Sequence, residues 1–93
     1  MTMGARIFVG NLKFTVSEDE LRGAFARIGS VARAEIVRDK YDGRSRGFGF
    51  VEMATDGDAE RAVKELNGQQ LMYRPMRVEA ATTERPDLER VAS

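Results

Sequence analysis

If Arg46–Met53 is a β-strand, its side chains point to two faces with a period of two, and the charged residues fall on only one of these faces. One face of this strand holds Gly49, Val51 and Met53. The other face holds Arg46, Phe48, Phe50 and Glu52. Unpaired charges are costly to bury in a small core, so we expect the face with Val51 and Met53 to be the buried one. Two phenylalanines are therefore predicted to point away from the core.

A second stretch, Arg6–Gly10, repeats the pattern, with Ile7 and Val9 on one face and Phe8 on the other, beside Arg6. If the two strands are neighbours, their outward-facing rings form a surface that we call the aromatic platform, which consists of Phe8, Phe48 and Phe50. A contiguous exposed apolar patch usually marks a binding site. Flat aromatic rings beside arginine side chains suit stacked bases and phosphates. The pattern thus indicates a surface for nucleic acid.

Two other segments carry apolar residues at helical spacing. Ser17 and Glu20 have the spacing of a capping box, which predicts a helix that begins at Ser17 and ends before Gly29. A second helix is predicted to begin at Thr55 or Asp56 and to end at an Asn-Gly pair. The predicted buried stripes are Leu21, Ala24, Phe25 and Ile28 in the first helix, and Ala59, Ala62, Val63 and Leu66 in the second.

Two further strands complete the predicted elements. Val31–Arg38 alternates as a strand, but its parity slips before Ala34, which indicates a β-bulge or a late start. The turn-rich segment Asp39–Ser45 follows it as a loop that is too long for a tight hairpin. Leu71–Tyr73 is predicted to be a short extended piece, and Met76–Ala80 the last strand.

The order of these elements is βαββαβ, the ferredoxin-like sandwich of the α+β class, with a four-stranded antiparallel sheet. Crossover connections are right-handed, so both helices are expected on one face, where Gly49 leaves space for a helix to pack. Nothing in the domain covers the opposite face, which agrees with an exposed aromatic platform. We assign residues 6–81 to one domain, residues 1–5 to a disordered lead, and residues 82–93 to a tail that is mostly disordered or forms a short helix.

The two strands that carry the platform also resemble the motifs of a known family. Arg46–Met53 resembles the RNP1 octapeptide of the RNA recognition motif, K/R-G-F/Y-G/A-F-V-x-F/Y, and Ile7–Leu12 resembles its RNP2 hexapeptide. Only Met53 departs from the octapeptide, where the family has an aromatic residue, and by the alternation Met53 points into the core. The resemblance extends from about Arg6 to Ala81.

The resemblance implies a small, single-domain protein that binds a few nucleotides of single-stranded RNA, in post-transcriptional regulation or RNA processing. Single-stranded DNA is a second possible ligand. The resemblance implies that Phe8 and Phe50 stack on bases, that Phe48 packs against sugars or between neighbouring nucleotides, and that Arg46 contacts a phosphate. The candidate RNA-binding residues are Arg6, Phe8, Asn11, Lys13, Arg44, Arg46, Phe48, Phe50, Arg77 and Glu79.

Several of these candidates have a second interpretation. The basic residues Arg6, Lys13, Arg44 and Arg77 either contact RNA or are solvated surface charges. Asn11 either contacts a base or orders the loop after the first strand. Glu79, which can only accept hydrogen bonds, either receives amino or ring N–H groups of a base or pairs with Arg77. Tyr41 is a further aromatic side chain that can stack on a base.

The charges of the chain balance, with 15 basic and 15 acidic residues, although nucleic-acid-binding domains are usually basic. Both predicted helices carry more acids than bases, whereas Arg38–Arg46 carries more bases than acids. We infer a basic sheet side, which steers RNA to that face, and an acidic helical back. The alternative function is a protein-interaction module that uses the acidic helical face.

The chain has no cysteine and no histidine, which removes the usual zinc ligands, the thiol nucleophile and the neutral-pH base. Most catalytic constellations are thereby excluded, so we expect neither an enzyme nor a bound cofactor or metal ion. No apolar run reaches membrane-spanning length, and the start of the chain lacks the pattern of a secretory signal. We expect a monomer in the cytoplasm, or in the nucleus or an organelle of a eukaryotic cell. A protein partner on the acidic helices is compatible with this interpretation.

Overall fold

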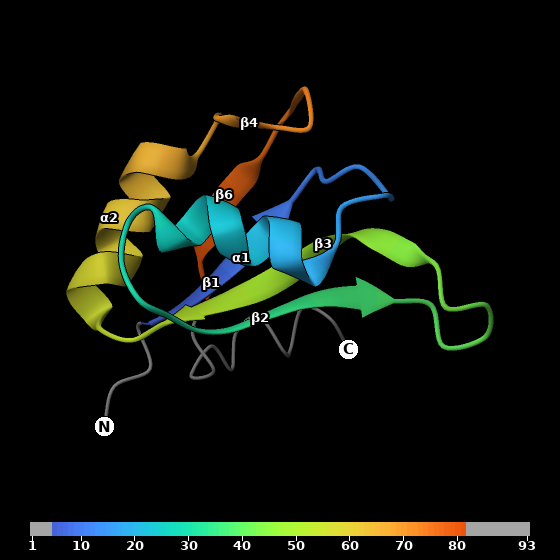
Figure 1. The fold of residues 1–93 in the computed structure, drawn as a ribbon, viewed down its shortest axis with the longest axis horizontal. Helices are drawn as coiled ribbons and strands as arrows, with labels where there is room; N and C mark the ends of the chain where they lie inside the picture. The colour runs from blue at the N-terminus through green and yellow to red at the C-terminus, as the bar shows by residue number, and fades with distance from the viewer. Residues whose placement is uncertain (1–4, 82–93) are drawn as a thin grey trace, which may run out of the picture.

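The sheet that carries the platform has four antiparallel strands in the order β2-β3-β1-β6 (Figure 1). The structure is a computed structural model, and it describes residues 5–81. The strands are β1 (Arg6–Gly10), β2 (Val31–Arg38), β3 (Ser45–Met53) and β6 (Arg77–Ala80). The helices α1 (Glu18–Ala26) and α2 (Asp56–Leu66) lie on one face, and β4 (Gln70–Leu71) pairs with β5 (Arg74–Pro75) in a separate hairpin. The predicted ferredoxin-like α+β fold is confirmed.

The alternation of β3 sorts its residues between the two faces as predicted. Every second residue from Ser45 to Met53 is buried, and the residues between them are half-buried or exposed. The side chains of Ile7, Leu21 and Phe25 are fully buried, and each stabilises the fold by about 1.5–3 kcal/mol. The core therefore lies between the helices and one face of the sheet, and the platform residues are on the other face.

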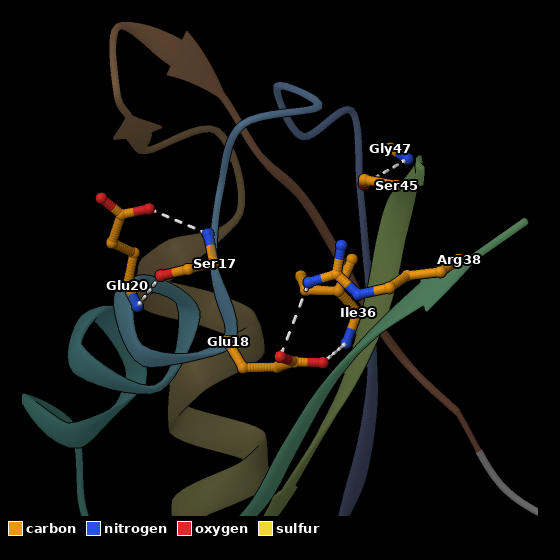
Figure 2. Close-up of polar contacts among 7 residues, drawn as sticks. All are labelled: Ser17, Glu18, Glu20, Ile36, Arg38, Ser45 and Gly47. Carbon is orange, nitrogen blue, oxygen red and sulfur yellow. Dashed lines mark hydrogen bonds and ion pairs between the residues drawn. The ribbon is translucent and has the colours of Figure 1, made fainter. Parts of the chain in front are cut away.

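Both helices begin where the sequence predicts. The hydroxyl of Ser17 accepts from the N–H of Glu20 (3.1 Å), and the carboxylate of Glu20 accepts from the N–H of Ser17 (2.8 Å), which completes the capping box (Figure 2). Thr55 rather than Asp56 caps α2, because its hydroxyl accepts from the N–H of Asp58 (3.1 Å). The first helix ends at Ala26, earlier than expected, although the next apolar residue of its stripe still packs on the core.

The irregularity predicted near the start of β2 is a shift in strand register. Val31 pairs with Met53, but Arg33 pairs with Glu52, so β2 has one residue more than β3 in this interval. The shift places Arg33 on the platform face, and Glu35 follows there, opposite Phe50. A second shift, between Ile36 and Arg38, was not predicted.

On each edge strand, β2 and β6, a side chain accepts a hydrogen bond from one backbone N–H. The carboxylate of Glu18, at the start of α1, accepts from the N–H of Ile36 (3.1 Å) and lies 3.6 Å from the guanidinium of Arg38 (Figure 2). At the other edge, the side-chain oxygen of Asn67 accepts from the N–H of Val78 (3.0 Å). These bonds satisfy backbone donors that strand pairing leaves open, which disfavours pairing with another chain.

One prediction about β-structure is wrong, and another is correct only in part. The space at Gly49 is taken by the backbone of β2 and not by a helix, because a Cβ there would contact the Glu35 carbonyl oxygen and lie 3.1 Å from the Cα of Ile36. The predicted extended piece Leu71–Tyr73 is extended only at Leu71, which ends β4. Met72 (φ 54°) and Tyr73 (φ 69°) instead form the turn between β4 and β5, and both are left-handed. Such a pair of residues closes a two-residue hairpin.

The predicted lead and tail lie outside the described residues, apart from Ala5. Within residues 5–81, neither helix has the length and apolar character needed to cross a membrane.

Candidate nucleic-acid interface

The three platform rings come together on the face that the helices leave open. Phe8 of β1 is directly opposite Phe50 of β3, and Phe48 lies two residues earlier in β3. The ring centroids are 5.7 Å apart for Phe8 and Phe48, 5.9 Å for Phe8 and Phe50, and 6.5 Å for Phe48 and Phe50. All three side chains are half-buried, although they lie on the face opposite the core. They form one contiguous aromatic surface.

The residues beneath and beside these rings determine where the rings point. Ile7, Val9 and Val51 are fully buried on the other face, so the alternation of the strands forces the neighbouring phenylalanines outward. Gly10 leaves room for the Phe8 ring, because a Cβ at that position would lie 2.9 Å from its Cε2 atom. A substituted residue would push the ring aside.

Arginine side chains surround the platform. The guanidinium carbon of Arg6 lies 4.4 Å from the centroid of the Phe50 ring, a distance typical of a cation–π contact. Arg46 is exposed and makes no ion pair with another residue among 5–81. Arg77 donates to Glu79 (2.7 Å), which is directly opposite Phe8 on the neighbouring strand. The pairing alternative for Glu79 is thus realised, through one of its two carboxylate oxygens.

Asn11 is engaged with the chain itself. Its backbone is left-handed (φ 60°), and its side-chain N–H donates to the carbonyl of Pro75 (2.6 Å). Its side-chain oxygen accepts two bonds from Arg74, at 3.2 Å from Nε and 3.1 Å from Nη2. The structure therefore favours the loop-ordering interpretation, in which Asn11 ties the β4–β5 hairpin to the end of β1.

The remaining candidates lie outside the platform. The ammonium of Lys13 is 5.9 Å from the centroid of the Tyr73 ring, beyond the end of β1. Arg44 and Tyr41 belong to the loop between β2 and β3. The N–H of Asp39 donates to the carbonyl of Arg44 and the N–H of Gly43 donates to the carbonyl of Asp39, which closes this loop. The side chain of Arg44 is 85% exposed and lies 3.9 Å from a carboxylate oxygen of Asp42. Contact of these residues with RNA stays a prediction.

An open groove of about 880 Å³ continues from the platform past the end of β1. Its lining includes Phe8, Phe14, Arg46, Phe48, Arg74 and Arg77. Phe14 and Arg74 were not among the predicted site residues. Phe14 fits neither helical nor strand spacing, so only its position as an aromatic residue in a loop, next to Lys13, could have drawn attention to it.

The charge distribution differs from the expected basic sheet. The outer face of the sheet carries four basic and three acidic residues: Arg6, Arg33, Arg46, Arg77, Glu35, Glu52 and Glu79. The face itself is close to neutral, and positive charge gathers at the groove, where arginines from three strands meet. Any electrostatic steering should therefore act mainly at this end of the sheet.

The acids of the helical face are partly used by the fold. Glu18 is bonded to β2, and a carboxylate oxygen of Asp58 lies 3.5 Å from Arg61. Glu60 is exposed and makes no ion pair within the described part of the chain. Among residues 5–81 there is no cluster of three or more acidic residues that could hold a metal ion.

Comparison with known proteins agrees with this geometry. Residues 7–77 match the family model of the RNA recognition motif. The chain is 47% identical over 75 residues to the 29 kDa chloroplast ribonucleoprotein B of Nicotiana sylvestris, a match that covers 81% of this chain and 26% of the relative. It is 44% identical over 75 residues to the protein named "Putative RNA-binding protein RbpB" of Nostoc sp., a match that covers 81% of this chain and 73% of the relative.

A solved structure, the crystal structure of the RNA-binding protein PG1, superposes with a TM-score of 0.81 at 45% identity and covers 91% of this chain and 99% of that chain. The chain spans about a quarter of the length of the chloroplast ribonucleoprotein.

Proposed function

Because the chain belongs to the RNA recognition motif family, we propose that it binds a few nucleotides of single-stranded RNA across the aromatic platform. The observation that carries this proposal is the contiguous arrangement of Phe8, Phe48 and Phe50 on the face that the helices leave open. Phe8 and Phe50 stack on bases, Phe48 packs against sugars, and Arg46 contacts a phosphate. The biological role is post-transcriptional regulation or RNA processing.

The platform accounts for moderate affinity. Each base stacked on an aromatic side chain contributes about 1–3 kcal/mol, and two or three stacks, less the cost of ordering, give a Kd on the order of micromolar. Two to four phosphate contacts release few counterions, so log K falls with log salt with a slope of roughly −1.4 to −2.8. The nearly neutral sheet face suits a site in which stacking dominates.

Two charged residues tune this site. Arg6 covers the ring of Phe50, so a base that stacks there displaces the guanidinium, which is then free to contact the RNA backbone. The carboxylate of Glu79 lies beside the Phe8 position and accepts hydrogen bonds only. It favours bases that present an amino or ring N–H group, and we expect Glu79→Gln to change base preference more than overall affinity.

The test is fluorescence anisotropy of a labelled, randomised single-stranded RNA of about eight nucleotides, measured at two salt concentrations. We expect Phe50→Ala to weaken binding more than roughly tenfold, since tenfold corresponds to about 1.4 kcal/mol and one stack contributes about 1–3 kcal/mol. Phe50→Tyr retains a stacking ring and serves as the matched control. RNA affinity that is unchanged in a folded Phe50→Ala variant would contradict the proposal.

The protein-interaction alternative is not favoured, because Glu18 and Asp58 are engaged within the fold. Glu60→Lys, on the helical face, should leave RNA affinity unchanged. Single-stranded DNA should bind the same surface, because stacking does not require a 2′-hydroxyl. The monomeric state and a cytoplasmic or organellar location stay predictions.

A further inference from the structure

Phe14 is a large apolar side chain that the fold leaves in solvent. It is 72% exposed, in the loop between β1 and α1, and it lines the groove beyond the platform. A ring with this exposure adds little to the core. Because Phe8 and Phe48 line the same groove, Phe14 extends the exposed aromatic surface of the platform, and a contiguous apolar surface often marks a contact.

The loop holds Phe14 in a fixed place. Leu12 and Val16, on either side of it, are both buried, and the N–H of Leu12 donates to the carbonyl of Gly47 in β3 (2.9 Å). Gly47 is left-handed (φ 84°), and a Cβ there would lie 3.1 Å from the Cε1 atom of Phe14. The ring thus rests against the β3 backbone with most of its surface free.

Cations are placed in the same groove. Arg74 lines it and is held by two hydrogen bonds to Asn11, which occupy only part of the guanidinium donors. Arg46 lines it as well and is exposed. Neither arginine forms an ion pair with another residue of the described range 5–81. Their charges are therefore available to an anionic ligand.

We propose that this groove is a subsite for one further nucleotide of the bound RNA strand, whose base stacks on Phe14 and whose phosphate contacts Arg74 and Arg46. The proposal rests on the proposed function, because the groove shares Phe8 and Phe48 with the platform. RNA bound on the platform would continue into the groove. A nucleotide is the occupant that matches an exposed aromatic ring beside unpaired arginines. Asn11 acts here as a positioning residue, through Arg74.

The test measures the affinity of the wild type and of each variant for two RNAs of different length. An RNA of about three nucleotides occupies the platform only, and one of about eight nucleotides reaches the groove. We expect Phe14→Ala to weaken binding of the longer RNA, followed by anisotropy, about five- to tenfold. Binding of the shorter RNA, followed by NMR titration, should be unchanged. Phe14→Tyr keeps a ring and should bind like the wild type. Arg74→Ala should also weaken only the longer RNA, and it provides a second variant should Phe14→Ala fold poorly.

The outcomes separate this subsite from the platform. If Phe14→Ala and Arg74→Ala bind the longer RNA with wild-type affinity while Phe50→Ala loses it, the subsite is wrong and the proposed function stands. Equal weakening of both RNAs also contradicts the subsite, since the effect then acts through the platform. If the wild type binds neither RNA, the proposed function itself fails.

Discussion

Replacement of Glu18 by alanine tests how the structure uses the acidic start of α1. The carboxylate accepts from the N–H of Ile36 at the edge of β2 and lies beside Arg38 (Figure 2). Asp19 is the neighbouring acid in the same helical turn, and no hydrogen bond or ion pair joins its side chain to another residue in the described range 5–81. The pair Glu18→Ala and Asp19→Ala thus separates the contact with the sheet from the general effect of a negative charge at a helix start.

The structure sets the size of the expected difference. A backbone N–H bonded to a charged acceptor contributes about 1.5–3 kcal/mol, and partial exposure at the sheet edge places this bond near the lower value. The side chains of Arg38 and Glu18 are 43% and 45% exposed, so their ion pair adds about 0–1 kcal/mol. We expect Glu18→Ala to lower the free energy of unfolding by about 1.5–2.5 kcal/mol. Asp19→Ala loses only the interaction with the helix dipole, about 0.3–1 kcal/mol.

Thermal and urea unfolding measure this difference directly. A loss of this size lowers Tm by roughly 6–20 °C for Glu18→Ala, and Glu18→Gln, which keeps an acceptor oxygen, should fall between it and the wild type. Equal losses in Glu18→Ala and Asp19→Ala would refute the contact with β2. RNA affinity of the folded Glu18→Ala variant should not change, because Glu18 is on the helical side of the sheet.

Two further predictions concern backbone geometry. Gly49→Ala places a methyl group against the β2 backbone and should destabilise the fold by about 1–3 kcal/mol or more, whereas Gly57→Ala, with open space around it in α2, should be neutral or stabilising by up to about 1 kcal/mol. Urea unfolding checks both, and equal stabilities would contradict the close approach of β2. Asn11→Gly keeps the left-handed backbone but releases Arg74, so it should weaken binding of the longer RNA about as much as Arg74→Ala while changing Tm by only a few degrees. Wild-type affinity in Asn11→Gly, measured by anisotropy, would show that Asn11 does not act through Arg74.

Local patterns in the sequence predicted most of the fold. The alternation in β1 and β3 predicted which face holds the platform, and Ser17 with Glu20 predicted the start of α1. The parity slip before Ala34 predicted the register shift in β2. These features depend on residues close together in the chain, where the periods of strands and helices act directly.

The unpredicted features depend on contacts between distant residues. Asn11 bonds to Arg74, 63 positions away, and nothing near either residue indicates the pairing. The role of Gly49 depends on how closely β2 approaches β3, which the composition of one strand does not reveal. Met72 and Tyr73 are unusual residues for a left-handed turn, which glycine and asparagine normally occupy, so the β4–β5 hairpin lacked its usual signal.

The groove could not be predicted from the sequence for the same reason, because it forms between residues that are distant in the chain. The platform is encoded in two short strands, but the groove is assembled from the β1–α1 loop, the β4–β5 hairpin and the ends of three strands. Phe14 and Arg74 become neighbours of the platform only through that assembly. A loop aromatic residue has no periodic pattern that distinguishes a binding role from accidental exposure.

The most direct test of the central claim is an NMR titration of the ¹⁵N-labelled protein with a single-stranded RNA of about eight nucleotides. We predict that the largest amide shift changes fall in β1 and β3, around Phe8 and Phe50, and continue into the loop that carries Phe14. The amides of α1 and α2, on the opposite face, should change little. Shift changes that cluster on the two helices and leave β1 and β3 unaffected would contradict RNA binding on the aromatic platform.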